Sequence, residues 1–222
     1  MARPVLVIGN KNYSSWSLRP WLLLKVKDIA FDEIRIPLYQ QNSKAAIQAR
    51  APAGRARYGK VPMFEDGDLT VWDSLAICEY AAECHPALHC WPADVRDRAR
   101  ARSISAEMHS GFRTLRTQMP MNCRRTPAPV PRNDELDADI ARVVEIWTQA
   151  RDAHAAPGPY LFGEFGIADA MYAPVVLRFT AYAVDLPATA RAYADAILAL
   201  PALQAWIADA RRETEVLEHF QK

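Results

Sequence analysis

Short apolar runs separated by turn signals fill the first 84 residues of the chain. The run PVLVIG (4–9) ends in a Gly-Asn turn signal and predicts a buried strand. A segment rich in Leu and Trp, 15–27, predicts a helix. Apolar residues that alternate over 34–38 predict a second strand, and the polar segment 40–60 favours only a short helix.

The segment VPMFEDGDLTVW (61–72) contains two apolar runs joined by the acidic turn 65–68, a pattern typical of a β-hairpin. A helix predicted from Ser74 to Cys84 follows the hairpin. The resulting order is strand, helix, strand, short helix, strand, strand, helix. We therefore expect a small α/β domain over residues 1–84.

The pattern becomes helical in period after a proline-containing linker, 85–92. The next apolar residues recur at spacings of three or four and predict one face of a single long helix: Ile104, Met108, Phe112, Leu115 and Met119. A proline-rich break, 123–134, cannot be helix interior. These features indicate an all-helical second domain over 93–222.

Three further helices are expected in this second domain. Apolar positions from 136 to 147 mark the first of them. The segment 168–184 is apolar nearly all round, so it should form the domain core. The segment 200–213 has the pattern of a last amphipathic helix.

Composition and charge narrow the classes of function. Half of the 222 residues are hydrophobic and 24% are charged, which is typical of a globular protein. With 27 basic and 26 acidic residues the net charge is +1, which disfavours nucleic-acid and anionic-lipid binding. No apolar run approaches the roughly 20 residues of a membrane span, and the N-terminal run is too short for a secretory signal. We expect no nucleic acid or membrane partner.

The cysteines and histidines give no metal-ligand pattern. Cys78, Cys84, Cys90 and Cys123 contain no C-x-x-C pair, so neither a zinc site nor a redox dithiol is predicted. His154 and the other histidines show no ligand spacing. A reduced, cytoplasmic setting without a bound metal is the expectation.

Three loops of the first domain carry polar groups at element ends. Hydroxyls gather in YSSWS (13–17), although one serine suffices to cap a helix. In KVP (60–62), Pro62 begins a strand and is either a plain trans proline or a cis peptide. Asp73 and Ser74 open a helix, where they cap it or present N–H groups to an anion.

Four segments in this order carry a resemblance over nearly the whole chain: YSSWSLRPWLLLKVKDIAF, GKVP, WDSLAICEYAAECHP and YLFGEFGIADAMYAPVV. The chain resembles the cytosolic glutathione transferases, and its first segment is similar to the serine-opened helix of the zeta class. The resemblance implies a thioredoxin-like first domain, an all-helical second domain, glutathione as co-substrate, a small electrophile and a homodimer. This fold agrees with the element order above.

The resemblance also implies residue roles around the glutathione thiol. Ser14 stands where the zeta class keeps the serine that hydrogen-bonds the sulfur, and Ser15 donates a second bond or replaces it; Tyr13 and Ser17 are the remaining alternatives. A thiol has a reference pKa of about 8.5. A hydroxyl donor and a helix N-terminus both favour the thiolate, so the serine itself need not ionise.

The other glutathione contacts implied by the resemblance lie in the two later loops. Val61, before a cis Pro62, pairs its backbone with the cysteinyl backbone of glutathione. Asp73 takes the γ-glutamyl ammonium and Ser74 the carboxylate. The glycine carboxylate would meet either Lys60 or, upstream, Lys44 and Gln41.

Three departures from the family pattern bear on function. Trp16 stands where related classes carry cysteine, which excludes a mixed disulfide there and weakens the case for a maleylacetoacetate isomerase. About four extra residues near 54–59 make the glycine-end contacts uncertain. Gly166 stands at the cap of the core helix, with Asp169 three residues on, where the family prefers Ser or Thr.

The electrophile site is expected on the predicted long helix of the second domain. At spacings of three and four, His109, Phe112 and Arg116 would share a face. One interpretation makes Phe112 core and the two polar residues solvated or at a dimer interface; the other has Arg116 or His109 attract an anionic substrate. We expect a glutathione transferase, with a non-catalytic binding module or a glutathione-dependent isomerase as alternatives.

Overall fold

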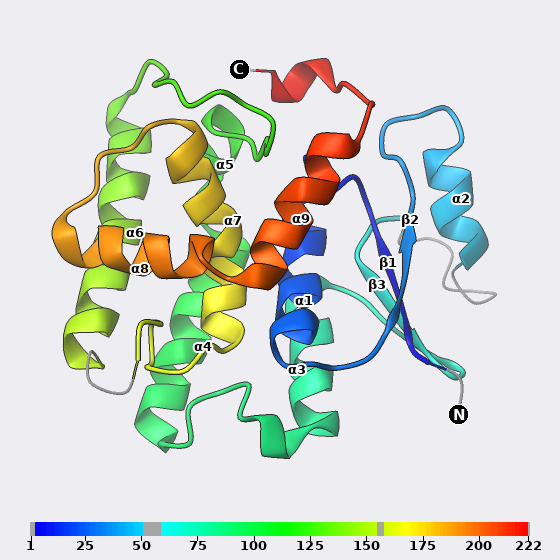
Figure 1. Ribbon diagram of the computed structural model, residues 1–222, viewed down its shortest axis with the longest axis horizontal. Helices are drawn as coiled ribbons and strands as arrows, with labels where there is room; N and C mark the ends of the chain where they lie inside the picture. Colours follow the sequence, from blue (N-terminus) through cyan, green and yellow to red (C-terminus); the bar gives the residue numbers. More distant parts are fainter. Residues whose placement is uncertain (1–2, 51–58, 155–157, 222) are drawn as a thin grey trace.

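The four strands of the N-terminal part form one mixed sheet in a computed structural model, which describes residues 3–50, 59–154 and 158–221 (Figure 1). Its order is β2-β1-β3-β4. Strand β1 pairs parallel to β2 and antiparallel to β3, and β3 pairs antiparallel to β4. The strands are β1 (Val5–Ile8), β2 (Asp32–Arg35), β3 (Met63–Asp66) and β4 (Leu69–Val71).

Helices cover both faces of this sheet, because successive side chains of a strand point to opposite sides. Leu6 and Ile8 of β1 belong to the main core, which also contains α1 and α3 residues, whereas Val7 packs with Ile47 of α2. Figure 1 shows α1 and α3 between the sheet and the helical part, and α2 on the outer side. The helices are α1 (Ser15–Val26), α2 (Ser43–Arg50) and α3 (Ser74–Cys84).

The second part of the chain packs around α7, which lies at its centre (Figure 1). Nearly every residue of α7 is buried, as an all-round apolar helix requires. Trp147, Tyr172, Phe179 and Tyr193 form an aromatic cluster there. The helices are α4 (Val95–Ser110), α5 (Arg113–Gln118), α6 (Asp134–Ala153), α7 (Ile167–Ala181), α8 (Ala188–Leu198) and α9 (Pro201–Arg212), with short 3₁₀ turns at Pro86–Leu88 and Glu218–Phe220.

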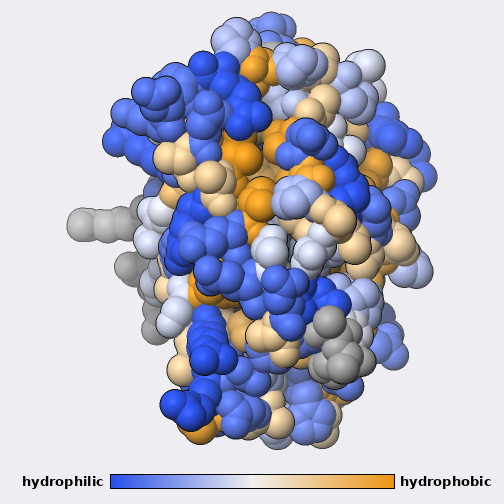
Figure 2. Space-filling model, turned by 90° about the vertical axis from the view of Figure 1, so that its left-hand side faces the viewer, coloured by the Kyte–Doolittle hydropathy of each residue, from blue (hydrophilic) through white to orange (hydrophobic). Residues whose placement is uncertain are grey.

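The outer side of the helical part is mainly hydrophilic. Figure 2 shows blue side chains over most of this face and a narrow hydrophobic band within it. Helix α6 explains the pattern, because its apolar residues are buried while its first turn carries three acidic residues. The charged side chains on this face therefore lie at the surface, where water solvates them.

The start of α7 is held by a buried carboxylate. Gly166 is the N-cap, as the sequence predicted, and supplies no capping side chain. Asp169, 1% exposed, instead accepts hydrogen bonds from the backbone N–H groups of Leu161 (3.0 Å) and Gly166 (2.9 Å). It thus joins the segment before α7 to the helix itself.

The two parts of the chain are joined by polar contacts as well as by apolar packing. Trp206 of α9 donates its indole N–H to the Lys11 carbonyl at 2.8 Å. The Lys11 ammonium lies 2.7 Å from Asp209 of α9 and 2.8 Å from Glu33 of β2. These contacts fix α9 against the end of β1 and the start of α1, where the hydroxyl cluster lies.

Two sequence predictions need correction. The single long helix is wrong: α4 ends at Ser110, Phe112 takes a left-handed φ of 56°, and α5 starts at Arg113. The second strand was predicted over 34–38, but β2 covers 32–35 and ends before Ile36. The Ile36 N–H still donates to the Ile8 carbonyl.

The sequence analysis also missed α8. The predicted helix from Ser74 to Cys84 is confirmed.

Candidate functional site

The hydroxyl cluster lies at the N-terminus of α1, where free backbone N–H groups and the helix dipole favour negative charge. Ser14 is the N-cap, and its Oγ accepts from the Ser17 N–H at 3.4 Å. The hydroxyls of Ser14 and Ser17 lie 2.7 Å apart, and Ser17 Oγ also accepts from the Gly9 N–H. When Ser17 donates to Ser14, the Ser14 hydroxyl keeps its hydrogen for another acceptor.

Ser15 has a different partner, contributed by the helical part. Arg178 of α7 donates from Nη2 to Ser15 Oγ at 3.1 Å and from Nη1 to the Met119 carbonyl at 2.7 Å. Because arginine only donates, Ser15 Oγ is the acceptor and its own hydrogen stays available. Ser14 and Ser15 are 7% and 8% exposed, so both hydroxyls lie just below the surface.

Tyr13 and Ser17, the other two hydroxyls of the cluster, have structural partners. The Tyr13 hydroxyl accepts from Arg124 and from Gln221, both at 2.9 Å, and so faces the C-terminal segment. Ser17 is fully buried and holds the Gly9 N–H at the end of β1. Ser15 therefore keeps its hydrogen for another acceptor, and Ser14 does so when Ser17 is the donor of the bond between them.

The start of α3 provides a second group of polar atoms. Asp73 is its N-cap and accepts from the Leu75 N–H at 2.9 Å. Ser74 is fully buried, and its Oγ has no hydrogen-bond partner among the described residues. An unpartnered buried hydroxyl at a helix N-terminus is the kind of group that an anionic ligand satisfies.

The loop before β3 contains the predicted cis peptide: the Val61–Pro62 bond is cis, so the plain trans interpretation is wrong. Pro62 is buried and Val61 half-buried, whereas Lys60 is exposed. Lys44 and Gln41, the alternatives to Lys60, are also exposed. The segment with extra residues falls mostly on 51–58, which lies outside the described residues.

Trp16 joins the predicted electrophile residues to α1. Its ring lies 5.1 Å from the His109 ring in an edge-on contact, and the Arg116 guanidinium lies 5.4 Å from its centre. Arg116 also donates from Nη1 to the His109 carbonyl at 3.2 Å. His109 Nε2 in turn lies 3.3 Å from an Asp73 carboxylate oxygen, which links this group to α3.

His109, Phe112 and Arg116 do not share a helical face, because the chain leaves the helical conformation between α4 and α5. The turn at Gly111 and Phe112 nevertheless returns Arg116 to the His109 backbone. Phe112 is 7% exposed and belongs to the main core, in agreement with the core interpretation of this residue. His109 and Arg116 are half-buried beside Trp16 rather than fully solvated.

Two arginines that the sequence analysis did not select complete the site. Arg19 of α1 is 2% exposed, and its guanidinium lies 4.4 Å from the centre of the Trp16 ring. Arg178 is 4% exposed. Both arginines lie within apolar helical runs. Because an unpaired buried charge is costly, an arginine in such a run indicates that it needs a polar partner.

Burial governs the protonation of these groups. It lowers the pKa of Arg19 to about 9, with further lowering by Arg116 and Arg178, and lowers that of Arg178 to about 10. Burial also lowers the pKa of Arg116 and, despite the nearby Asp73 carboxylate, that of His109. At pH 7 the arginines are therefore charged and His109 is neutral, so the field at Trp16 is positive and favours anions.

Other features of the molecule do not point to a competing site. A cavity of about 420 Å³ lies where the linker meets the start of α7, and His154 and Asp97, 3.1 Å apart, are among its lining residues. Within 3–50, 59–154 and 158–221, no three potential metal ligands gather. None of the described helices is both long and apolar enough to cross a membrane.

Family models match both parts of the chain. The model described as glutathione S-transferase, N-terminal domain, matches residues 13–84, and that described as glutathione S-transferase, C-terminal domain, matches 131–209. The first range contains the hydroxyl cluster, the cis proline and the start of α3. The second contains Arg178 and the capped start of α7.

Individual proteins with similar sequences include two isomerases. A probable maleylacetoacetate isomerase of Caenorhabditis elegans is 32% identical over 113 residues, which are 51% of this chain and half of that protein. The maleylacetoacetate isomerase of Rattus norvegicus is 26% identical over 205 residues, 91% of each chain.

Solved structures with the same fold include several glutathione transferases. A glutathione transferase homolog from Burkholderia, with bound glutathione, has a TM-score of 0.70 at 22% identity and covers 96% of this chain and 100% of its own. The Tau class glutathione S-transferase of mango has a TM-score of 0.68 at 17% identity, covering 92% of each chain. At these identities the likeness concerns the fold alone.

Proposed function

The chain belongs to the glutathione S-transferase superfamily, and on this premise we propose that it is a glutathione transferase, which adds the thiolate of bound glutathione to a small electrophile. The observation that carries this proposal is the pair of seryl hydroxyls at the α1 N-terminus: Ser15 accepts from Arg178 and keeps its hydrogen, and Ser14 keeps its hydrogen when Ser17 donates to it. They lie in the family's N-terminal domain, which also contains the cis Val61–Pro62 bond and the polar start of α3.

In the proposed reaction, Ser14 donates a hydrogen bond to the glutathione sulfur. This bond and the positive end of α1 stabilise the thiolate over the thiol. Ser15, whose oxygen accepts from Arg178, is the second donor to the same sulfur. The thiolate then forms a bond to the electrophilic carbon, and the leaving group departs with the electron pair.

The rest of glutathione would lie along α3 and the loop before β3. We assign its cysteinyl backbone to Val61 and its γ-glutamyl carboxylate to Ser74, whose hydroxyl lacks a partner among the described residues. Asp73 would take the ammonium group through the carboxylate that faces His109. Lys60, or Lys44 and Gln41, would meet the glycine carboxylate.

The direct test of this function is binding and turnover. We expect isothermal calorimetry to detect glutathione binding with one site per chain, and purified protein to accelerate the conjugation of glutathione with 1-chloro-2,4-dinitrobenzene. S-Methylglutathione, which cannot form a thiolate, is the matched control and should bind but not react. Absence of binding would instead support a non-catalytic module on this fold, and binding without turnover would exclude the transferase.

A glutathione-dependent isomerase is the second candidate, and the names of the C. elegans and rat relatives favour it. In such a reaction glutathione adds to a conjugated double bond and is then eliminated unchanged. Trp16 argues only against versions that need a cysteine at this position. The two candidates are separated by whether a cis-enone substrate isomerises with glutathione remaining at its starting concentration.

We also propose a homodimer, as the family resemblance implies. Exposed apolar side chains on the edge strand support a protein contact there: Leu69 of β4 and Trp72 directly after it are each 39% exposed. We expect equilibrium sedimentation to give twice the mass of one chain. Leu69→Lys should shift the equilibrium towards monomer, whereas Val216→Lys, at an exposed apolar residue of the C-terminal segment, should not. A monomeric wild type would contradict the proposal.

A cytoplasmic location is proposed on the state of the cysteines. All four are free, and burial raises the pKa of Cys78, Cys90 and Cys123. Free cysteines, three of them with thiols of raised pKa, fit a reducing compartment. Fractionation of the source cells, with antibody detection, would test this location.

A further inference from the structure

We propose that the electrophile carries a carboxylate, which Arg116 binds beside Trp16 with Arg19 behind it. This inference rests on the proposed glutathione chemistry and specifies its second substrate. The first observation is the excess of positive charge at the site. Arg116 and Arg178 lie close enough to Arg19 to lower its pKa, and Arg116 also lowers the pKa of Arg178.

None of these three guanidinium groups has an ion-pair partner among the described residues. Arg142, by contrast, is paired with both oxygens of Glu107 at 2.8 and 3.0 Å. Two carboxylates act on the cluster, Asp73 and Asp139. Each already accepts a backbone N–H, from Leu75 and Leu115 respectively. The site thus has more positive than negative charge.

Arg19 provides the second observation. Its Nε and Nη1 atoms are buried, and neither has a hydrogen-bond partner in the described ranges. Its contact with the Trp16 face stabilises the cation in part. Buried guanidinium N–H groups without acceptors are unfavourable, so a negatively charged ligand near Trp16 would be attracted by a cation that the protein itself leaves unpaired.

Arg116 is the arginine placed to touch such a ligand. It is half-buried, whereas Arg19 and Arg178 are almost completely enclosed. Among the described residues its side chain donates only from Nη1, to the His109 carbonyl. A guanidinium has five N–H donors and its planar shape matches a carboxylate, so Arg116 retains donors for two parallel bonds.

Two other roles of Arg116 would be alternatives to binding of the electrophile, and the experiment must distinguish them from it. It could bind a carboxylate of glutathione itself, because Asp73, an expected glutathione contact, lies beside His109. Alternatively, Arg116 could serve only the packing of Trp16. Loss of the first role would change the affinity for glutathione, and loss of the second would change the turnover of all electrophiles equally.

The experiment compares an anionic electrophile with its neutral ester. Glutathione displaces chloride from 4-chloro-3,5-dinitrobenzoate and from its methyl ester: the sulfur bonds to the ring carbon, and chloride leaves with the electron pair. Each kcat/KM is divided by the rate constant of the uncatalysed reaction, which removes intrinsic reactivity. We expect the wild type to favour the benzoate by about tenfold or more, as one charged hydrogen-bonded pair allows.

Arg116→Gln should then lower kcat/KM for the benzoate by about 10- to 100-fold and leave that for the ester within about threefold. Arg116→Lys should restore part of the loss, because the charge is kept but the paired geometry is not. Arg113→Gln, at an exposed arginine of the same short helix, is the matched control and should change neither substrate. The KM for glutathione should stay constant throughout.

A second measurement does not depend on a folded variant. 3,5-Dinitrobenzoate lacks a leaving group and should inhibit the wild type more strongly than its methyl ester, competitively against the electrophile. Equal inhibition and equal turnover of acid and ester would overturn the anionic substrate class. A raised KM for glutathione in Arg116→Gln would overturn the assignment of Arg116. If the ester is also not turned over, the proposed transferase function fails instead.

Discussion

Asp169→Ala should lower the free energy of unfolding by about 3 kcal/mol or more, the largest stability effect that we expect from a single side chain here. The substitution leaves the N–H groups of Leu161 and Gly166 without their acceptor. Gly166 is the N-cap of α7 and Leu161 lies in the segment before it, so the carboxylate joins the two at the helix around which the helical part packs. Since Gly166 supplies no capping side chain, no other group of the cap replaces the carboxylate.

The pH dependence of this effect follows from burial. Burial raises the pKa of Asp169 to about 6 and outweighs the opposing hydrogen bonds from Leu161 and Gly166. The unfolded value lies near 3.9, so the folded state holds the proton more tightly. This contribution to the free energy of unfolding is fully present at low pH and is lost as the pH rises from about 4 through 6. The difference between wild type and Asp169→Ala should therefore be larger at pH 5 than at pH 7.

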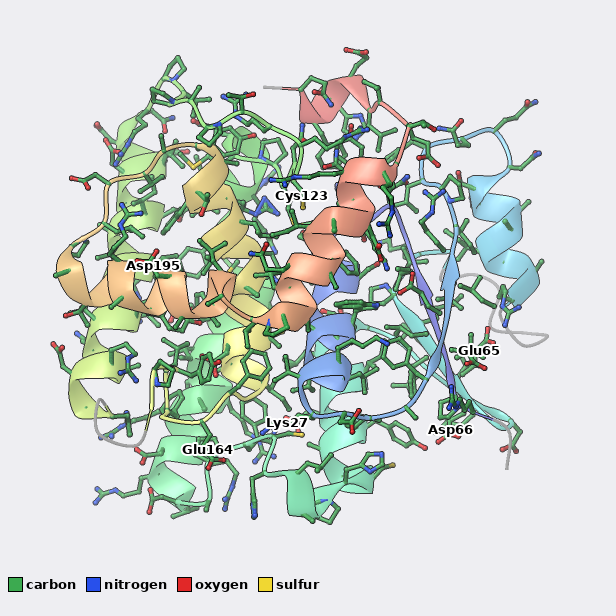
Figure 3. The ribbon with its side chains drawn as sticks, viewed as in Figure 1. Lys27, Glu65, Asp66, Cys123, Glu164 and Asp195 are labelled. Carbon is green, nitrogen blue, oxygen red and sulfur yellow. The ribbon has the colours of Figure 1, made fainter. Side chains whose placement is uncertain are left out.

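Urea unfolding at pH 5 and pH 7, followed by circular dichroism, measures this difference. Asp195→Ala is the matched control, because Asp195 is an exposed residue on α8 (Figure 3) and should change stability by less than about 0.5 kcal/mol. If Asp169→Ala unfolded at the same urea concentration as Asp195→Ala, the carboxylate would not hold the start of α7.

The helix boundaries that could be predicted, the start of α1 and both ends of α3, have local signals. Ser14 and Asp73 are N-caps whose side chains accept backbone N–H groups one turn away or less, and the helix from Ser74 to Cys84 is found where the sequence places it. The same holds for the apolar helix over α7, whose burial requires only that every face be apolar. Such features depend on a few neighbouring residues, which the sequence displays directly.

The interruption between α4 and α5 was missed for a physical reason. Phe112 and Leu115 are both buried, so the apolar spacing continues across a point where the backbone changes conformation. The available signal was Gly111: a Cβ there would lie 2.8 Å from the Glu107 carbonyl oxygen, so the chain needs glycine to end α4. The spacing of apolar residues predicts which side chains face the core, but it does not show whether they belong to one helix or to two.

The arginines of the site could not be predicted from local pattern. Arg178 meets Ser15 across 163 positions of sequence, and Arg19 meets Trp16 and the charge of Arg116 only because α1 packs against the helical part. The positions of Arg19 and Arg178 in apolar runs indicate that each needs a polar partner, but they do not identify that partner. This is why the hydroxyls of the candidate site were selected from sequence and the cations around them were not.

Ser14→Ala should reduce kcat/KM for 1-chloro-2,4-dinitrobenzene by about 10²- to 10³-fold, since removal of one preorganised donor to a developing or bound anion has effects of this size. The pKa of the bound glutathione thiol, followed by thiolate absorbance, should rise towards the reference value of about 8.5. The affinity for glutathione should change little, because we assign its backbone contacts to Val61 and α3.

Ser15→Ala gives the discriminating comparison. It removes the acceptor of the Arg178 Nη2 bond as well as a hydroxyl donor, whereas Ser14→Ala removes the weak cap bond and the 2.7 Å contact with the Ser17 hydroxyl. Both variants should therefore lose activity and some stability, and Ser15→Ala should lose more stability because a charged donor is left without its acceptor. Ser103→Ala, at an exposed serine of α4 that bonds only within its helix, controls for the loss of a hydroxyl. If both active-site variants kept full activity and an unchanged thiol pKa, a serine-stabilised thiolate would be the wrong mechanism. A larger loss of activity in Ser15→Ala, with the thiol pKa raised only there, would transfer the role from Ser14 to the serine that Arg178 holds.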